Sequence, residues 1–264
     1  MSTTLPTASL VELAARKQLP QHQYIDRATV SWITANRPDV PDGTTPRLRP
    51  AAERLLLASA IPADWWAEAG TEDSLHGVRH GMRTAALAAL LAALPAEDAG
   101  PEGTGLDEDA TADLVLAAAV HDCRRRHDKD DRGHGARAAS WLSANADRVW
   151  GHFQLTATPP RVERAAIAVR LHDVPYADFG PDDRTDHARA EKLCDLLKAA
   201  DALDRYRLPN LSWWPDGTRI RAAAFDRLRA IAFDLVVASE TARLAGLDSA
   251  AAVHEALRQR ELLS

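Results

Sequence analysis

The sequence has little cysteine, no long apolar run and no obvious export signal. Its two cysteines, Cys123 and Cys194, lie far apart and form no Cys-x-x-Cys pair. They indicate neither a disulfide framework nor a thiolate zinc site, which fits a reducing compartment. The longest uninterrupted apolar stretch, Ala85 to Leu94, is about half the length that a membrane span needs. The N-terminal residues lack a basic start followed by an apolar core. We therefore expect a soluble cytoplasmic protein with no membrane partner.

The composition also has little that would suit β-structure or a nucleic-acid partner. Alanine and leucine dominate, while β-branched and aromatic residues do not alternate with polar ones, so the predicted fold class is all-α. The formal net charge is −6 in a chain of 264 residues. This acidic balance argues against a large nucleic-acid-binding face. The length predicts one domain of catalytic size with terminal extensions.

The positions of proline, glycine and capping residues predict the order of the helices. We expect Ser74 to cap the first central helix, and Asp109 or Thr111 to cap the next. Loops are predicted at 36–50, 96–108 and 177–186, which are rich in proline, glycine or aspartate. The main helices are expected at 74–94, 109–122, 134–150, 161–171, 187–206, 219–245 and 249–263.

Several predicted helices carry a polar metal-binding residue type at or near one end. The apolar run from Leu114 to Val120 leads directly into His121 and Asp122, and burying this pair without a partner would cost several kcal/mol. His80, His172 and Asp201 lie near the ends of other helices, and His134 begins one. Imidazole and carboxylate together are a common ligand set for divalent ions. These residues therefore predict a metal site where the helix ends meet.

The order of these residues resembles the signature of the HD-domain superfamily of metal-dependent phosphohydrolases. The likeness covers about residues 74–207, roughly half of the chain. It consists of His76-Gly-x-x-His80-x-x-Arg83, His121-Asp122, His134-Gly-x-x-Ala-Ala, His172 and Lys198-x-x-Asp201-Ala-Leu-Asp204-Arg205.

The resemblance implies an HD-domain helical bundle with N- and C-terminal helical extensions. The HD metal-binding domain would span 71–207, preceded by a helical extension with a proline-rich loop at 1–70. C-terminal helices at 208–264 would pack on the HD core. One or two divalent ions would lie at the centre, with Mn, Fe, Co, Ni, Mg and Zn as candidates. By family analogy the first ion binds His80, His121, Asp122 and Asp201, and the second binds His134 and His172 with Asp122 as the bridge.

The implied activity is hydrolysis of a phosphate ester by a metal-activated water. The substrate would be a nucleotide or another small phosphomonoester or phosphodiester, because the metals attract an anion. Two other classes use nearly the same ligands. One is a mixed-valent di-iron oxygenase, and the other is a non-catalytic module that senses a metal or a nucleotide. The tryptophan pairs at 65–66 and 213–214 are typical of core or interface anchors, and a homodimer is one option.

Further basic and acidic residues near the ligands are candidates for substrate contacts. Among Arg124, Arg125 and Arg126 we favour Arg125 as a phosphate ligand, since three successive arginines cannot all face one pocket. Lys198 lies on the same helical face as Asp201 and would contact phosphate or protonate the leaving group, unless it pairs with Asp195 or Asp201. Three more roles are predicted: Asp204 orients a ligand, Arg205 or Arg207 reaches a phosphate, and His76 serves as a hydrogen-bond partner, a substrate contact or a cap.

Overall fold

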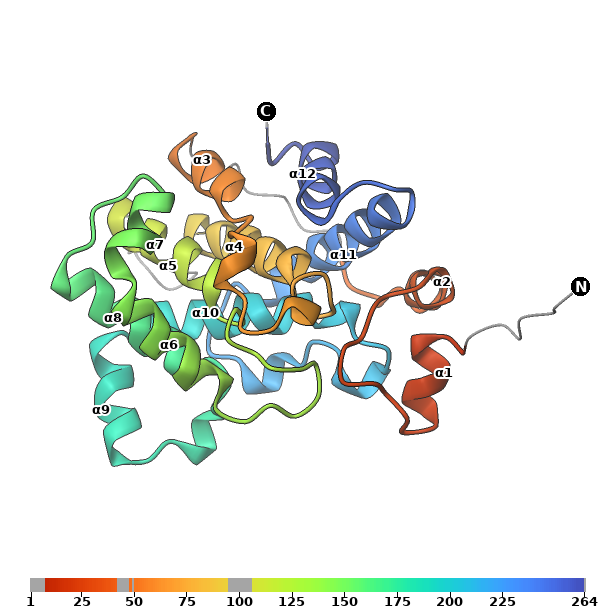
Figure 1. The fold of residues 1–264 in the computed structure, drawn as a ribbon, viewed down its shortest axis with the longest axis horizontal. Helices are drawn as coiled ribbons and strands as arrows, with labels where there is room; N and C mark the ends of the chain where they lie inside the picture. The colour runs from red at the N-terminus through yellow and green to blue at the C-terminus, as the bar shows by residue number, and fades with distance from the viewer. Residues whose placement is uncertain (1–7, 42–47, 49, 95–105, 264) are drawn as a thin grey trace, which may run out of the picture.

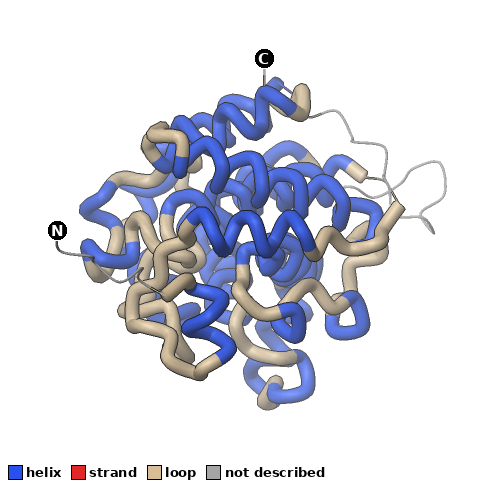
Figure 2. Tube along the Cα trace, turned by 90° about the vertical axis from the view of Figure 1, so that its right-hand side faces the viewer, coloured by secondary structure: helices blue, strands red, loops and turns tan. Residues whose placement is uncertain are grey.

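The chain folds into a bundle of helices around two buried central ones (Figure 1). The structure is a computed structural model, and it describes residues 8–41, 48, 50–94 and 106–263. Within these ranges all regular structure is helical, and Figure 2 shows no strand there. The all-α prediction is therefore confirmed. In the same part of the chain, no helix combines the length and the apolar character that crossing a membrane requires.

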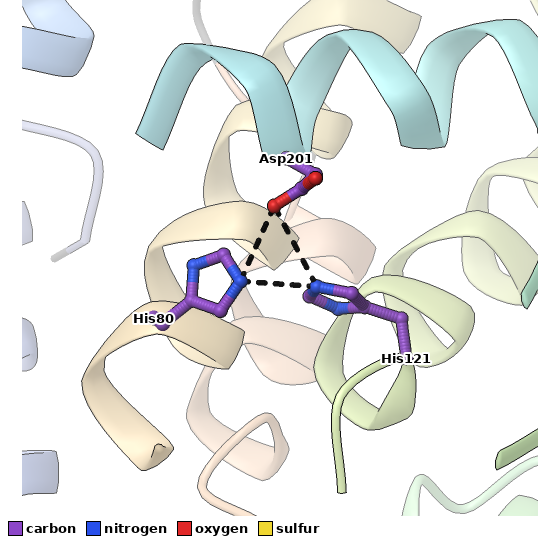
Figure 3. Close-up of side chains that lie close together, drawn as sticks. All are labelled: His80, His121 and Asp201. Carbon is purple, nitrogen blue, oxygen red and sulfur yellow. Dashed lines mark hydrogen bonds and ion pairs between the residues drawn. The ribbon is translucent and has the colours of Figure 1, made fainter. Parts of the chain in front are cut away.

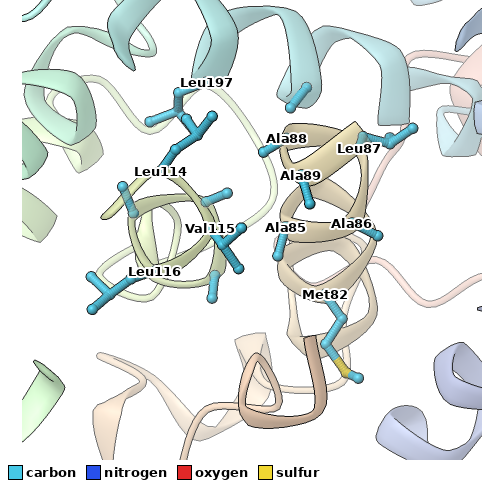
Figure 4. Close-up of a cluster of buried hydrophobic side chains, with 14 of the residues drawn as sticks. Met82, Ala85, Ala86, Leu87, Ala88, Ala89, Leu114, Val115, Leu116 and Leu197 are labelled. Carbon is cyan, nitrogen blue, oxygen red and sulfur yellow. The ribbon is translucent and has the colours of Figure 1, made fainter. Parts of the chain in front are cut away.

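The centre of the bundle is the helix pair α4 (Val78–Ala93) and α5 (Glu108–Val120). Every residue of α4 from Val78 to Leu91 is buried, and so is every residue of α5 from Ala112 to Val120. A helix that is buried on all sides must lie inside the molecule. Small residues on α4 allow its backbone to lie close to α5 (Figure 4). A Cβ atom added to Gly81 would stand 2.9 Å from the carbonyl oxygen of Ala119.

Five more helices lie on the side of this pair that carries the predicted ligands. They are α6 (His134–Ala144), α7 (Ala146–His152), α8 (Pro159–Leu171), α9 (Pro181–Arg189) and α10 (Glu191–Leu203). Helix α10 packs against α4, α5 and α8, and α6 packs along α8. Consequently the ends of α5, α8 and α10 and the starts of α4 and α6 approach one another.

The terminal segments add helices on the other faces of the central pair. They are α1 (Leu10–Ala15), α2 (Arg27–Ala35), α3 (Pro50–Ala58), α11 (Arg229–Leu244) and α12 (Ser249–Gln259). Helices α11 and α12 pack on each other and on α4, while α2 packs on α11 (Figure 1). One hydrophobic core includes side chains from α2, α3, α11 and α12 as well as the central pair, such as Ile33, Leu90 and Val253, while Leu10 of α1 belongs to a smaller separate cluster. The C-terminal helices thus cover the face of α4 that lies away from α5.

Short 3-10 helices connect several of these elements. They are η1 (Ala63–Trp65), η2 (Ala69–Thr71), η3 (Tyr176–Asp178), η4 (Asp204–Arg207), η5 (Leu211–Trp213), η6 (Gly217–Arg219) and η7 (Asp226–Leu228). Of these, η4 follows α10 directly and continues its course past Asp201.

The prediction that Ser74 caps the first central helix is wrong. Helix α4 begins three residues later, after the N-cap Gly77, and Ser74 is buried. Its hydroxyl donates instead to the carboxylate of Asp128 at 2.8 Å. Helix α5 is capped by Asp107, two residues before Asp109 and four before Thr111, and the Asp107 side chain accepts from the Ala110 amide.

Other predicted boundaries were wrong where a local signal was missed. The helix expected at 134–150 is divided at Asn145 into α6 and α7. The loop expected at 177–186 contains most of α9, which begins at Pro181, a residue suited to the first helical turn. Helix α2 lies in a stretch for which no helix was predicted. Of the predicted loops at 36–50 and 96–108, residues 42–47, 49 and 96–105 lie outside the described residues.

The close approach of α4 and α5 predicts opposite effects for two glycine-to-alanine substitutions. Gly81→Ala should lower the free energy of unfolding by about 1–3 kcal/mol, because its methyl group would meet backbone and force the helices apart. Gly151→Ala is the matched control, since its Cβ would meet nothing within 4 Å. It should leave stability unchanged or raise it by up to about 1 kcal/mol. Chemical denaturation measures both, and equal effects would contradict this packing.

Candidate metal centre

Five helix ends bring the six predicted ligands together. His80 lies in the first turn of α4, and Asp201 lies in the last turn of α10. His121 and His172 follow the last residues of α5 and α8, and His134 is the first residue of α6. The turn before α6 requires Gly133, whose φ of +74° is in the left-handed region that favours glycine. The loop thereby returns to the site and places His134 opposite Asp122.

The first half of the centre, called subsite 1, is formed by His80, His121 and Asp201 with one oxygen of Asp122. Figure 3 shows the two imidazoles and the Asp201 carboxylate pointing toward one another. The two Nε2 atoms are 3.0 Å apart, and Asp201 Oδ1 is 3.3 Å from His80 Nε2. Asp122 Oδ2 lies 3.5 Å from His80 Nε2 and 3.8 Å from His121 Nε2. Two nitrogen and two oxygen atoms therefore face one point.

The second half, called subsite 2, is formed by His134 and His172 with the other oxygen of Asp122. The Nε2 atoms of the two histidines are 3.0 Å apart. Asp122 Oδ1 lies 3.0 Å from His134 Nε2 and 3.4 Å from His172 Nε2. This oxygen is buried and has no hydrogen-bond partner. The Asp122 carboxylate thus directs one oxygen to each subsite, which is the arrangement of a bridging ligand.

Hydrogen bonds on the far side of each ring orient the four histidines. Each Nδ1 faces a protein acceptor, which in the neutral imidazole places the proton on Nδ1 and the lone pair of Nε2 toward the centre. The acceptors are Asp204 Oδ2 for His80 at 2.8 Å, and the carbonyl oxygens of Ala118, Asp131 and Val169 for His121, His134 and His172 at 2.7, 2.8 and 2.6 Å.

The facing imidazoles and carboxylates make the centre suitable for cations. Three neighbouring carboxylates raise the pKa of His80 to about 9 against the effect of burial, so without a bound cation this imidazole is protonated. A divalent ion could replace that proton and be coordinated by the facing Nε2 atoms, since imidazole with carboxylate is a suitable ligand set. The lack of a hydrogen bond to the buried Asp122 Oδ1 points to the same conclusion. The buried histidine and aspartate groups could therefore hold metal ions in both subsites.

The charges in the centre also favour cations. Burial alone would raise the pKa of Asp122, but Arg125 and the adjacent histidines outweigh burial and hold it well below its usual value. The pKa of Asp201 is likewise lowered against the effect of burial, mainly by His80. Burial lowers the pKa of His121 to about 3, so this imidazole is neutral and free to coordinate. Both carboxylates are consequently ionised beside it.

The centre opens to solvent next to Asp201. The Asp201 side chain is 26% exposed, whereas the His80 and His121 side chains are fully buried. Asp173, which lies 3.3 Å from His134 Nδ1, is 15% exposed. A substrate would therefore approach across Asp201 and Asp173 rather than through the bundle.

Of the three consecutive arginines, only Arg125 reaches the centre. Its Nη1 lies 3.1 Å from His134 Nε2 and 3.7 Å from Asp122 Oδ1. Arg124 donates to the carbonyl of Trp65, and Arg126 is exposed. This placement agrees with the preference for Arg125, whose role in substrate binding stays a prediction.

Lys198 is buried beside the centre and lies behind His172. Its Nζ donates to the carbonyls of His172 and Val174 at 3.0 and 2.5 Å and lies over the ring of Tyr176. Burial lowers its pKa to about 8. These contacts support a role in holding the turn after α8. The predicted contact with phosphate or the leaving group stays a prediction.

Arg207 is the basic residue after Asp201 that faces the centre. Its Nη2 lies 3.4 Å from His80 Nε2. Its Nη1 makes no hydrogen bond, although Asp204 Oδ2 is 3.3 Å away. Arg205 instead donates to the carbonyl of Trp213 at the surface.

Two buried acidic residues near the ligands were not among the predicted site residues. Asp128 lies in the loop after α5 and accepts hydrogen bonds from Ser74, His76 and the amide of Gln23. This contact holds the His76 ring beside the His80 ring and perpendicular to it. Glu240, on α11, connects to His80 through Arg83 and Asp204, and nothing in its local sequence indicates this.

Comparison of the chain with protein-family models, curated proteins and solved structures finds no match. The functional interpretation therefore depends on the residues of the centre themselves.

The bridging position of Asp122 predicts how metal content responds to substitution. Wild-type protein should bind up to two Mn²⁺ ions per chain, and Asp122→Asn should weaken both, because the group between the subsites loses its negative charge and an amide nitrogen replaces one of its two oxygens. Asp201→Asn should weaken subsite 1 alone. Isothermal titration and elemental analysis measure the number and affinity of the ions.

The exposed Asp130, in the same loop, provides the matched control for charge. Asp130→Asn should bind Mn²⁺ as the wild type does. If Asp122→Asn bound as many ions as tightly as Asp130→Asn, the metal centre would be wrong.

Proposed function

We propose that this protein is a member of the HD-domain superfamily and a metal-dependent phosphohydrolase acting on a small phosphate ester. The observation that carries the proposal is the division of the Asp122 carboxylate between two histidine pairs. Together with Asp201, this arrangement provides ligands for two neighbouring divalent ions. Such a pair supplies an activated water and stabilises negative charge on phosphoryl oxygens.

The protein residues would hold the reacting groups in fixed positions. Nearly complete burial and Nδ1 hydrogen bonds hold the four imidazoles in one orientation. Such fixed ligands do not need to reorganise when charge develops on the substrate. Asp201, the partly exposed member of subsite 1, lies where a substrate would enter.

Two buried arginines favour an anionic substrate. Arg125 lies next to subsite 2, and Arg207 lies next to subsite 1. A guanidinium group beside a bound cation is repelled unless an anion lies between them. A phosphate oxygen fits this position, because guanidinium donates well to phosphate oxygens. The two arginines would thus hold the phosphoryl group across the metals.

A substrate screen tests the proposed activity. Purified protein is supplied separately with Mn²⁺, Co²⁺, Ni²⁺, Mg²⁺ or Fe²⁺ and assayed for phosphate release from monoesters, diesters and nucleotides. We expect turnover of at least one ester class, with a loss of at least about a thousandfold in Asp122→Asn. Absence of turnover with every metal would contradict the proposal. Dioxygen consumption by the iron-loaded protein without phosphate release would instead favour the oxygenase.

The adjacent arginines provide a second test of the substrate class. Arg125→Ala should lower kcat/KM about 10–100-fold, because a hydrogen bond to a charged group contributes about 1.5–3 kcal/mol. Arg126→Ala removes the same charge from the next residue, which is exposed, and should stay within about twofold of the wild type. Steady-state kinetics on the ester found in the screen measures both. Equal losses in the two variants would argue against phosphate recognition by Arg125.

A further inference from the structure

We propose that Glu240, on the C-terminal helix α11, is a positioning residue for subsite 1 of the metal centre. The inference rests on the proposed metal centre, and it extends that centre into a part of the chain outside the HD-like segment. Glu240 is 2% exposed and touches none of the six ligands. It acts on His80 through two buried side chains, Arg83 and Asp204.

The link nearest the centre is the hydrogen bond between His80 and Asp204. His80 Nδ1 donates to Asp204 Oδ2 at 2.8 Å, and both side chains are fully buried. Asp204 is also paired with Arg83 and Arg207. A carboxylate on the far side of a ligand imidazole fixes its tautomer and increases its basicity at the metal-binding nitrogen.

The second link is Arg83, which holds both oxygens of Asp204. Arg83 Nε donates to Oδ1 at 2.6 Å and Nη2 donates to Oδ2 at 3.0 Å. This two-point contact fixes the plane of the carboxylate, which a lysine in its place would not do. Arg83 lies on the same helix as His80, less than one turn away.

The third link crosses from α4 to α11. Arg83 Nη1 donates to Glu240 Oε1 at 2.7 Å and to Ser239 Oγ at 3.0 Å. Glu240 also accepts from Arg79 Nε at 3.1 and 3.0 Å. The positive charge of each buried arginine is therefore compensated by a carboxylate, and the Arg83 guanidinium group is held in one orientation. Removing the Glu240 charge would leave Arg83 with only Asp204 as an anionic partner and allow both to shift.

This chain of contacts has a specific consequence for the two subsites. His80 belongs to subsite 1, whereas His134 and His172 are held by backbone carbonyls of Asp131 and Val169. The contacts that start at Glu240 reach only His80, and therefore only subsite 1. A residue that merely stabilised the fold would not distinguish between the subsites.

The test measures the affinity of each subsite separately in the full-length protein. His172→Ala impairs subsite 2 and leaves the side-chain ligands of subsite 1, while Asp201→Asn does the reverse. Co²⁺ titration followed by visible absorption gives the dissociation constant in each background. Glu240→Gln should raise the dissociation constant about 3–10-fold in the first background and leave it within about twofold in the second. This is less than the 10–100-fold typical of a direct partner of a ligand, because Glu240 is two contacts further out.

A double-mutant cycle tests whether the effect passes through Asp204. If it does, Asp204→Asn together with Glu240→Gln should bind Co²⁺ at subsite 1 as weakly as Asp204→Asn alone. Asp73→Asn is the matched control, since Asp73 binds Arg79 and Arg243 at the same interface but does not contact Arg83. It should leave both subsites unchanged.

Equal losses at both subsites, additive effects in the cycle, or no loss at subsite 1 would each overturn the proposal. If Glu240→Gln did not fold, Arg83→Lys tests the same chain, because lysine keeps the charge but cannot bridge Asp204 and Glu240. It should show the same selective loss. A wild-type protein that bound no Co²⁺ would overturn this inference and the metal centre together. Metal binding with a normal subsite 1 in Glu240→Gln would overturn this inference alone.

Discussion

The Asp122 carboxylate faces two pairs of imidazoles, and the arrangement of the surrounding helices serves this one contact. Its Oδ2 lies toward His80 and His121, and its Oδ1 lies toward His134 and His172. An ionised carboxylate inside a bundle is unfavourable unless cations or donors compensate it. Arg125 provides part of that compensation, and metal ions in the two subsites would provide the rest.

The fold meets this requirement by combining a rigid interior with polar helix ends. Helices α4 and α5 pack through small residues over most of their length, and their polar ends meet the ends of α6, α8 and α10. The ligands therefore lie on well-packed helices or directly next to them. Beyond the ligands, a network of buried charges runs from His80 to Glu240 and Arg79, and Arg79 also pairs with the partly exposed Asp73. The C-terminal helices thus contribute to the site as well as to the core.

The sequence predicted the centre better than its surroundings, for a physical reason. His121 and Asp122 directly follow a buried apolar run, so a local pattern indicates where they lie. The contacts of Asp204 and Glu240 join residues more than one hundred positions apart, and no local pattern encodes such a pairing. The start of α4 was missed for a similar reason. Serine is a residue type that often caps helices, but the Ser74 hydroxyl donates to Asp128, which is distant in sequence.

The most direct test of the account is a crystal structure of the protein loaded with Mn²⁺, with anomalous diffraction to locate the ions. The account predicts two anomalous peaks, one between Asp122 Oδ2 and the nitrogens of His80 and His121, and one between Asp122 Oδ1 and the nitrogens of His134 and His172. Such peaks would establish Asp122 as a bridging ligand. Well-ordered crystals with no anomalous peak beside Asp122, or with Mn²⁺ bound only elsewhere, would contradict the central claim.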